Sequence, residues 1–178
     1  MMQDQRRQPD DHSVAESPSR ICRESPLRLT LHTEVVIGAT PAQVWAVLTD
    51  FAGYGEWNQS IPAADGIARA GTMLRVTIHW PGLRSSPYAL EILAAEPERE
   101  LRWLGHFGRT GLMDGDHRFL IEPLGERRCR VIQTERFAGW LVPLFARWLR
   151  KNVLAGFESM NAALKERAEA QARPPSLS

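Results

Sequence analysis

Three polar residues in the second half of the chain, His117, Gln133 and Glu135, have types and a spacing that could do chemistry. Each lies in a segment where residues of opposite character alternate, and each shares its side with apolar residues such as Phe119. A turn near residues 124–126 places His117 across from Gln133 or, with a small shift, across from Glu135. An imidazole beside a carboxylate in an apolar pocket can move a proton, or orient a carbonyl or hydroxyl group of a ligand.

We favour a structural role for these residues over a catalytic one. Buried polar groups must find hydrogen-bond partners, and a bond that seals one end of a sheet meets that need without any further function. Glu135 also lies near the end of its segment, where water could reach it. The sequence therefore leaves enzymatic activity open, and it favours a binding protein without catalysis over an acid–base enzyme that uses His117 and Glu135.

The segments that must position these residues alternate with period two, as half-buried strands do. They are residues 28–37, 73–80, 88–95, 100–107, 116–123 and 128–137. One side of each is mostly apolar and the other mostly polar, which is typical of an antiparallel sheet with one covered face. Tight turns between consecutive strands predict a meander.

Two helices are expected around this sheet. Thr40, Pro41 and Gln43 form a capping box that begins a short helix, which ends near Asp50. A long helix is expected over residues 140–170, about 45 Å in length. It has a broad apolar stripe and needs a large apolar partner, which the concave face of the sheet can supply. The predicted fold is α+β, a curved antiparallel sheet wrapped around a long C-terminal helix.

Composition predicts one ordinary globular domain with two tails. The chain has 178 residues, is 43% hydrophobic and 24% charged, and carries a formal net charge of +1. Residues 1–26 contain few large apolar side chains and are expected to be a disordered tail, as is the segment 172–178 with its paired prolines. The domain is therefore expected to span residues 27–171.

Several classes of function are not expected. The 22 basic and 21 acidic residues form no basic cluster, so nucleic acid is not an expected partner. No histidine or cysteine pattern predicts a metal, no cofactor is expected, and Cys22 and Cys129 are expected to be free thiols. No apolar run is long enough to span a membrane and the start carries no secretory signal, so a cytoplasmic location is expected. The oligomeric state stays open.

Four stretches and the last helix resemble a known superfamily in their order and spacing. The stretches are 39–51, 54–58, 100–103 and 115–119 together with 135–139, and the similar part of the last helix is 156–165. They resemble the START-like superfamily, also called SRPBCC or polyketide cyclase/dehydrase-like, whose fold is the helix-grip. The resemblance covers roughly residues 33–169.

The resemblance implies a protein that binds a small hydrophobic ligand, such as a lipid, a polyketide or a quinone, between the sheet and the last helix. Some members catalyse cyclisation or dehydration, and others act as co-chaperones. Two alternatives therefore stay open: a cyclase or dehydratase using His117 and Glu135, and an interaction protein that docks through residues 140–148.

The predicted walls of this cavity come from the inward sides of the strands and the last helix. They are Trp80, Leu90, Trp103, Phe107, Met113, His117, Phe119, Gln133, Glu135, Phe137, Phe145, Trp148, Gly156 and Met160. Gly156 costs about 1 kcal/mol relative to alanine inside a helix, so it either admits a close neighbour or serves packing. The glycine-rich segment 108–115 is expected to be either a mobile loop over the cavity mouth or a plain hairpin connection.

Overall fold

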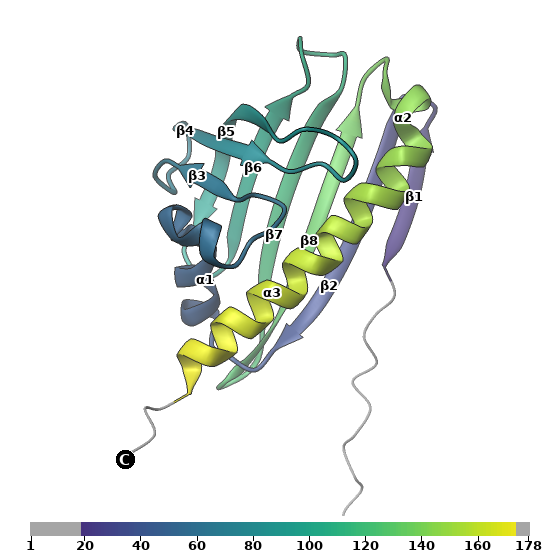
Figure 1. Cartoon of the computed structure of the whole chain (residues 1–178). Coiled ribbons are helices and arrows are strands. Elements are labelled where there is room, and N and C mark those ends of the chain that lie inside the picture. The colour runs from purple at the N-terminus through teal and green to yellow at the C-terminus, as the bar shows by residue number, and fades with distance from the viewer. Residues whose placement is uncertain (1–18, 174–178) are drawn as a thin grey trace, which may run out of the picture.

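The computed structural model describes residues 19–173, which form one eight-stranded antiparallel sheet with helices on its concave face (Figure 1). The strands lie in the order β1-β2-β8-β7-β6-β5-β4-β3. Their bounds are β1 Arg20–Ser25, β2 Arg28–Ile37, β3 Ala63–Asp65, β4 Met73–Ile78, β5 Ser86–Glu96, β6 Glu100–His106, β7 Asp114–Gly125 and β8 Arg128–Ala138. The long helix α3 (Leu154–Ala172) lies across the sheet, so the predicted α+β helix-grip fold is confirmed.

The central strands follow the alternation of the sequence. Every second residue of β8 from Cys129 to Phe137 is buried, while the residues between them are partly or fully exposed. The same pattern in β7 buries His117, Phe119 and Ile121. Because successive side chains point to opposite faces, this alternation turns one face of the sheet towards α3 and leaves the other to solvent.

The first helix begins as the capping box predicts. In α1 (Pro41–Thr49) the Thr40 hydroxyl accepts a hydrogen bond from the Gln43 amide at 3.2 Å, and Gln43 Oε1 accepts one from the Thr40 amide at 3.0 Å. The helix ends at Asp50, whose carboxylate accepts a bond from the Gly53 amide. A 3₁₀ segment, η1 (Phe51–Glu56), follows.

The C-terminal helix is continuous but not uniform. It consists of α2 (Val142–Trp148), the π-helical segment η2 (Leu149–Val153) and α3. The expected helix over residues 140–170 therefore contains a π segment that periodicity did not predict. Such segments often mark functional sites.

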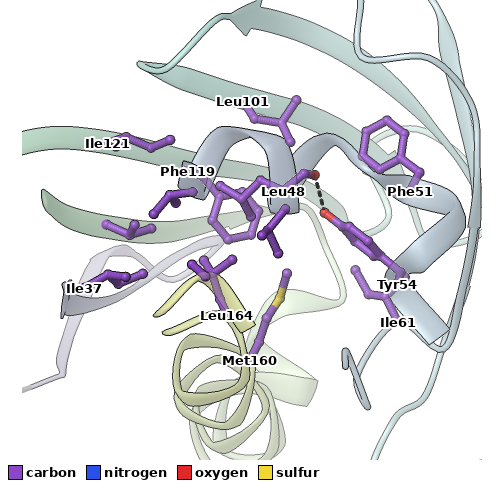
Figure 2. Packing of buried hydrophobic residues seen from close by; sticks show 14 of the residues in the cluster. Ile37, Leu48, Phe51, Tyr54, Ile61, Leu101, Phe119, Ile121, Met160 and Leu164 are labelled. Carbon is purple, nitrogen blue, oxygen red and sulfur yellow. Dashed lines mark hydrogen bonds between the residues drawn. The ribbon is translucent and has the colours of Figure 1, made fainter. Parts of the chain in front are cut away.

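Two groups of buried residues hold the helix on the sheet. The larger one packs α1, η1 and the second half of α3 on the strands around Phe119 (Figure 2). Inside it the hydroxyl of Tyr54 donates a 2.7 Å hydrogen bond to the carbonyl of Leu48, and burial, with a smaller contribution from the charge of Asp50, raises the pKa of that hydroxyl. The smaller group joins β2 and β8 to α2, η2 and the start of α3, and contains Phe137 and Phe157.

The prediction that residues 1–26 form a disordered tail is wrong in part. Residues 20–25, assigned to it from composition, form β1, which pairs antiparallel with β2 at the edge of the sheet. The side chains of β1 are nearly all exposed, so backbone hydrogen bonds, which composition does not report, hold the strand. At the other end α3 continues to Ala172, into the expected C-terminal tail. Residues 1–18 and 174–178 of the expected tails lie outside the described residues.

Membrane-spanning helices are not found between residues 19 and 173, where each helix is too short or too polar to cross a bilayer.

The two cysteines are free and differ in accessibility. Cys129 is fully buried and burial raises the pKa of its thiol to about 11, whereas Cys22 is exposed. Because the thiolate is the reactive form, we expect an aromatic disulfide reagent at about pH 8 to modify one thiol per folded chain and two per unfolded chain. In a Cys22→Ser variant the folded protein should be unreactive. Equal rates for both thiols in the folded protein would contradict this assignment.

Candidate functional site

A cavity of about 540 Å³ lies between the concave face of the sheet and the C-terminal helix. It separates the two buried groups described above, since its lining takes Trp103 and Met160 from the larger and Phe137 and Phe157 from the smaller. Exposed residues of the β4–β5 connection, such as Leu83, border its mouth. The wall is mostly aromatic and aliphatic, as in binding sites for small apolar molecules.

Strand register brings the predicted polar residues together. β7 pairs with β8 so that His117 stands opposite Glu135, while Phe119 stands opposite Gln133. The register thus selects the second of the two alternatives considered from the sequence. All four residues are at most 8% exposed.

His117 is held from both sides of its ring. Nδ1 lies 2.5 Å from Glu135 Oε2, and Nε2 lies 3.1 Å from Gln133 Nε2. Because an amide nitrogen can only donate, this arrangement makes Nε2 the acceptor and puts the proton of a neutral ring on Nδ1, facing the carboxylate. Gln133 Oε1 is buried and accepts no hydrogen bond from the described residues. Rotation of the amide would turn this oxygen towards Nε2, so Gln133 can serve a neutral or a charged ring.

Aromatic rings fix the plane of the imidazole. Trp103 stacks on His117 with ring centroids 5.0 Å apart and an interplanar angle of 24°. Phe119 lies at 4.6 Å, and Phe157 contacts the ring edge-on at 5.0 Å. With both nitrogens occupied and the ring enclosed, His117 orients Glu135 and is not itself free to bond to a ligand.

Glu135 offers the cavity a free acceptor. While Oε2 faces His117, Oε1 lies over Gly115, so close that a Cβ at this position would overlap it. Gly115, His117 and Glu135 all line the cavity. Oε1 accepts no hydrogen bond from residues 19–173, so it can accept one from a bound molecule.

Three other polar groups of the wall already donate hydrogen bonds within the protein. Trp80 Nε1 donates to the Tyr88 hydroxyl at 3.2 Å, and the Asn152 amide donates to the Trp148 carbonyl at 3.0 Å. Ser60 donates a 3.3 Å bond to the carbonyl of Gly156. A Cβ at Gly156 would lie 3.4 Å from the Ser60 oxygen, so this glycine admits the loop before β3 as well as lining the cavity.

The structure places all but two of the predicted wall residues in the lining of the cavity. The exceptions are Phe119 and Gln133, which alternation put on the correct face but which lie beneath His117 and Met160, away from the open space. Phe107 lies beyond the end of β6 and is 44% exposed, at the mouth. Whether the lining residues bind a ligand stays a prediction.

Several lining residues were not found from the sequence. Tyr88 alternates with Leu90 in a predicted strand and could have been found by extending that pattern, whereas Ser60 lies in a loop whose position only the fold defines. His106 was expected to face solvent but is half-buried, with Nδ1 2.7 Å from Asp114 Oδ1. His79 is exposed as expected, yet it borders the cavity.

The segment 108–115 connects β6 to β7 as a hairpin loop that is tied to the chain after β8. Trp140 and Leu141 donate backbone bonds to the carbonyls of Gly111 and Leu112, at 3.2 and 2.9 Å. The Gly111 amide donates its one N–H to both carboxylate oxygens of Asp114. These bonds favour the plain connection over the mobile loop.

Candidate metal ligands do not gather anywhere in the described part of the chain, where no three histidine, cysteine or acidic residues cluster.

Comparison with known proteins agrees with this geometry. A family model described as polyketide cyclase / dehydrase and lipid transport matches residues 28–169. The chain belongs to this polyketide cyclase/dehydrase family. The match begins with β2 and ends within α3, so it contains every strand and helix that lines the cavity. No curated protein matches the sequence.

Solved structures show how widely the fold of this family member is shared. A START superfamily protein from Mycobacterium smegmatis superposes with a TM-score of 0.64 at 19% identity, over 80% of this chain and 98% of that one. An aromatase/cyclase from a Streptomyces species gives 0.69 at 18%, over 84% and 98%. A norcoclaurine synthase from Thalictrum flavum gives 0.64 at 14%, over 83% and 98%. At these identities the likeness shows the fold alone, and it agrees with the helix-grip fold predicted from the sequence.

Proposed function

We propose that this protein binds a small, predominantly apolar molecule in the cavity between the sheet and the C-terminal helix. The observation that carries the proposal is the cavity itself, which has a volume of about 540 Å³ and a mostly aromatic and aliphatic wall. Small-molecule sites typically have volumes of about 300–1,000 Å³. A well-packed core would leave no space of this size.

The ligand carries a hydrogen-bond donor, such as a hydroxyl group. Glu135 Oε1 faces the cavity over Gly115 and has no donor among the described residues. A ligand that displaces water from this oxygen must supply a donor in its place, because an unpaired buried acceptor is costly. An aromatic or polycyclic alcohol therefore fits the wall better than a plain hydrocarbon.

Relatives support this class of ligand. The family description names polyketide cyclases, dehydrases and lipid transport. One similar solved structure is a norcoclaurine synthase in complex with dopamine and hydroxybenzaldehyde, two aromatic compounds that bear hydroxyl groups. That structure is 14% identical to this chain, with a TM-score of 0.62.

The natural ligand can be sought by native mass spectrometry of the freshly purified full chain, before and after exposure to a cell lipid extract. We expect a one-to-one complex that releases an apolar, hydroxyl-bearing compound on denaturation. A protein that stays empty in both experiments would argue against the proposal.

The aromatic alcohol 2-naphthol can serve as a probe for this site. Gly115→Ala is expected to weaken its binding about tenfold. The added methyl group would overlap Oε1 of Glu135 and turn the carboxylate away from the position in which it accepts the hydroxyl. Isothermal titration would measure the change. Gly38→Ala is the matched control, because its methyl group would also approach a glutamate, at 3.2 Å from Glu169 Oε1, but outside the cavity. Equal losses in the two variants would contradict the assignment.

An acid–base enzyme is the second candidate, and one observation favours it. The imidazole and the carboxylate are both in the cavity wall, with Nδ1 and Oε2 2.5 Å apart. In this case Glu135 would take a proton from a carbon next to a ligand carbonyl, while His117 holds the carboxylate in place. Exchange of the α-protons of 2-tetralone in D₂O distinguishes the two functions: acceleration that Glu135→Gln abolishes supports the enzyme, and no acceleration supports binding alone.

An interaction protein is less well supported. It would be favoured by a collapsed cavity with exposed tryptophans at the start of the last helix. Trp140 is 76% exposed, but Trp148 is half-buried beside Trp80 and the cavity is open.

A further inference from the structure

Three connections leave the sheet at the same end, around the mouth of the cavity. Neighbouring strands are antiparallel, so β4, β6 and β8 run in the same direction and finish at the same end of the sheet. The segments that follow them are residues 79–85, 107–113 and 139–141, the last leading into α2. Figure 1 shows α2 and the connection after β8 together at the top of the molecule.

Among the large apolar side chains of the described residues, the two with the highest exposed fractions lie at this end of the molecule. Leu144 is 77% and Trp140 76% exposed, more than any other large apolar residue there. In the other two connections Leu83 is 58%, Phe107 44% and Leu112 37% exposed. A group of exposed apolar side chains beside an apolar cavity marks an interaction surface. We call these five residues the mouth patch.

The backbone holds the mouth patch in place. Gly139 has a φ of 139°, and a Cβ there would overlap the carbonyl oxygen of Leu112. The bonds from Trp140 and Leu141 to Gly111 and Leu112 close this contact. The patch is therefore a built surface and not a set of frayed side chains.

The chain segments that carry the patch contain charged residues of one sign only. Segments 79–85, 107–113 and 139–151 contain no aspartate or glutamate, although the whole chain has a net charge of only +1. Arg84, Arg109, Arg147 and Lys151 are exposed there, and none of them pairs with a carboxylate of residues 19–173. Asp114, the nearest acidic residue along the chain, is bound by His106 and the Gly111 amide.

We propose that the mouth patch docks on the surface of an anionic lipid bilayer, with the cavity mouth against the headgroups. Tryptophan favours the boundary between headgroups and acyl chains, and leucine gains from burial there. Unpaired arginine and lysine side chains are attracted to anionic lipids. A protein partner would not need both the uniform positive charge and the position at the mouth, whereas a bilayer also supplies the route by which an apolar ligand enters.

Vesicle sedimentation with the full chain tests this proposal. Vesicles of phosphatidylcholine with about a third phosphatidylglycerol should bind the protein, while pure phosphatidylcholine vesicles and about 0.5 M salt should weaken binding severalfold. The double substitution W140A/L144A should weaken it about fivefold or more. The matched control is I67A/M73A, which removes side chains that are 68% and 50% exposed at the other end of the sheet and should leave binding unchanged.

A second pair, R109E/R147E, tests the charges if the first pair lowers the melting temperature. Binding to anionic vesicles should fall about as far as in the apolar variant. Equal binding of all variants to anionic vesicles would overturn the proposal. So would a second outcome, in which neither the parent protein nor any variant binds vesicles, while sedimentation velocity shows a dimer that W140A/L144A dissociates. Binding of 2-naphthol without vesicles should be the same in W140A/L144A and the parent protein, so docking and ligand binding can fail independently.

Discussion

Glu135→Gln is expected to abolish the preference of the cavity for ligands with a hydroxyl group. The parent protein should bind 2-naphthol about tenfold or more tightly than 2-methoxynaphthalene, because only the first can donate to Oε1, and hydrogen bonds to charged groups contribute about 1.5–3 kcal/mol. The glutamine keeps the shape of the side chain, and its oxygen can still accept from His117. The side chain is neutral, however, and its NH₂ group, a hydrogen-bond donor, takes the place of Oε1 over Gly115. Isothermal titration with both compounds measures the ratio of affinities.

The matched control for this prediction is Glu100→Gln. Glu100 is also buried in the sheet, but it pairs with Arg118 at 2.8 Å and does not line the cavity. Its replacement should leave the ratio of affinities as it is in the parent protein. A preference for 2-naphthol that persists in Glu135→Gln would show that another group accepts the hydroxyl.

Phe119→Ala is expected to lower the free energy of unfolding by about 3–5 kcal/mol without removing a wall of the cavity. The ring is fully buried and packs on His117 and Trp103, so its loss would create a new void beneath the site. Urea denaturation followed by circular dichroism measures the change.

Phe145→Ala provides the contrast. This side chain lines the existing cavity and is only half-buried, so its loss should cost less stability than that of Phe119 and weaken 2-naphthol binding more. The reverse order, with Phe145→Ala the more destabilising, would mean that the cavity is closed in solution and Phe145 is part of a packed core.

Much of the fold could be predicted because local patterns and tertiary structure agree. The capping box at Thr40 begins α1, and the alternation along β7 and β8 buries the face that α3 covers. The strand β1 could not be predicted in this way, since its side chains are exposed and edge pairing needs only backbone groups. The π segment was also missed, because apolar spacing in the sequence does not report a change in backbone bonding.

The sequence predicted which face of the sheet carries the site residues, but not which of them reach the cavity. Alternation put His117, Gln133 and Glu135 on the concave face, and the structure brings them together. It could not tell that Gln133 lies beneath the imidazole while Glu135 reaches the cavity. That difference depends on the exact register across the turn and on the lack of a side chain at Gly115, which leaves room for the carboxylate.

The six tryptophans of the chain offer the most direct test of ligand binding in the cavity. Trp80, Trp103 and Trp148 line the cavity, whereas Trp45, Trp57 and Trp140 do not. We would record the indole N–H resonances of the ¹⁵N-labelled full chain by NMR during titration with 2-naphthol. The first three resonances should shift and saturate together while the other three stay in place. No shift among the cavity tryptophans, or a shift of Trp140 alone, would contradict a ligand site between the sheet and the C-terminal helix.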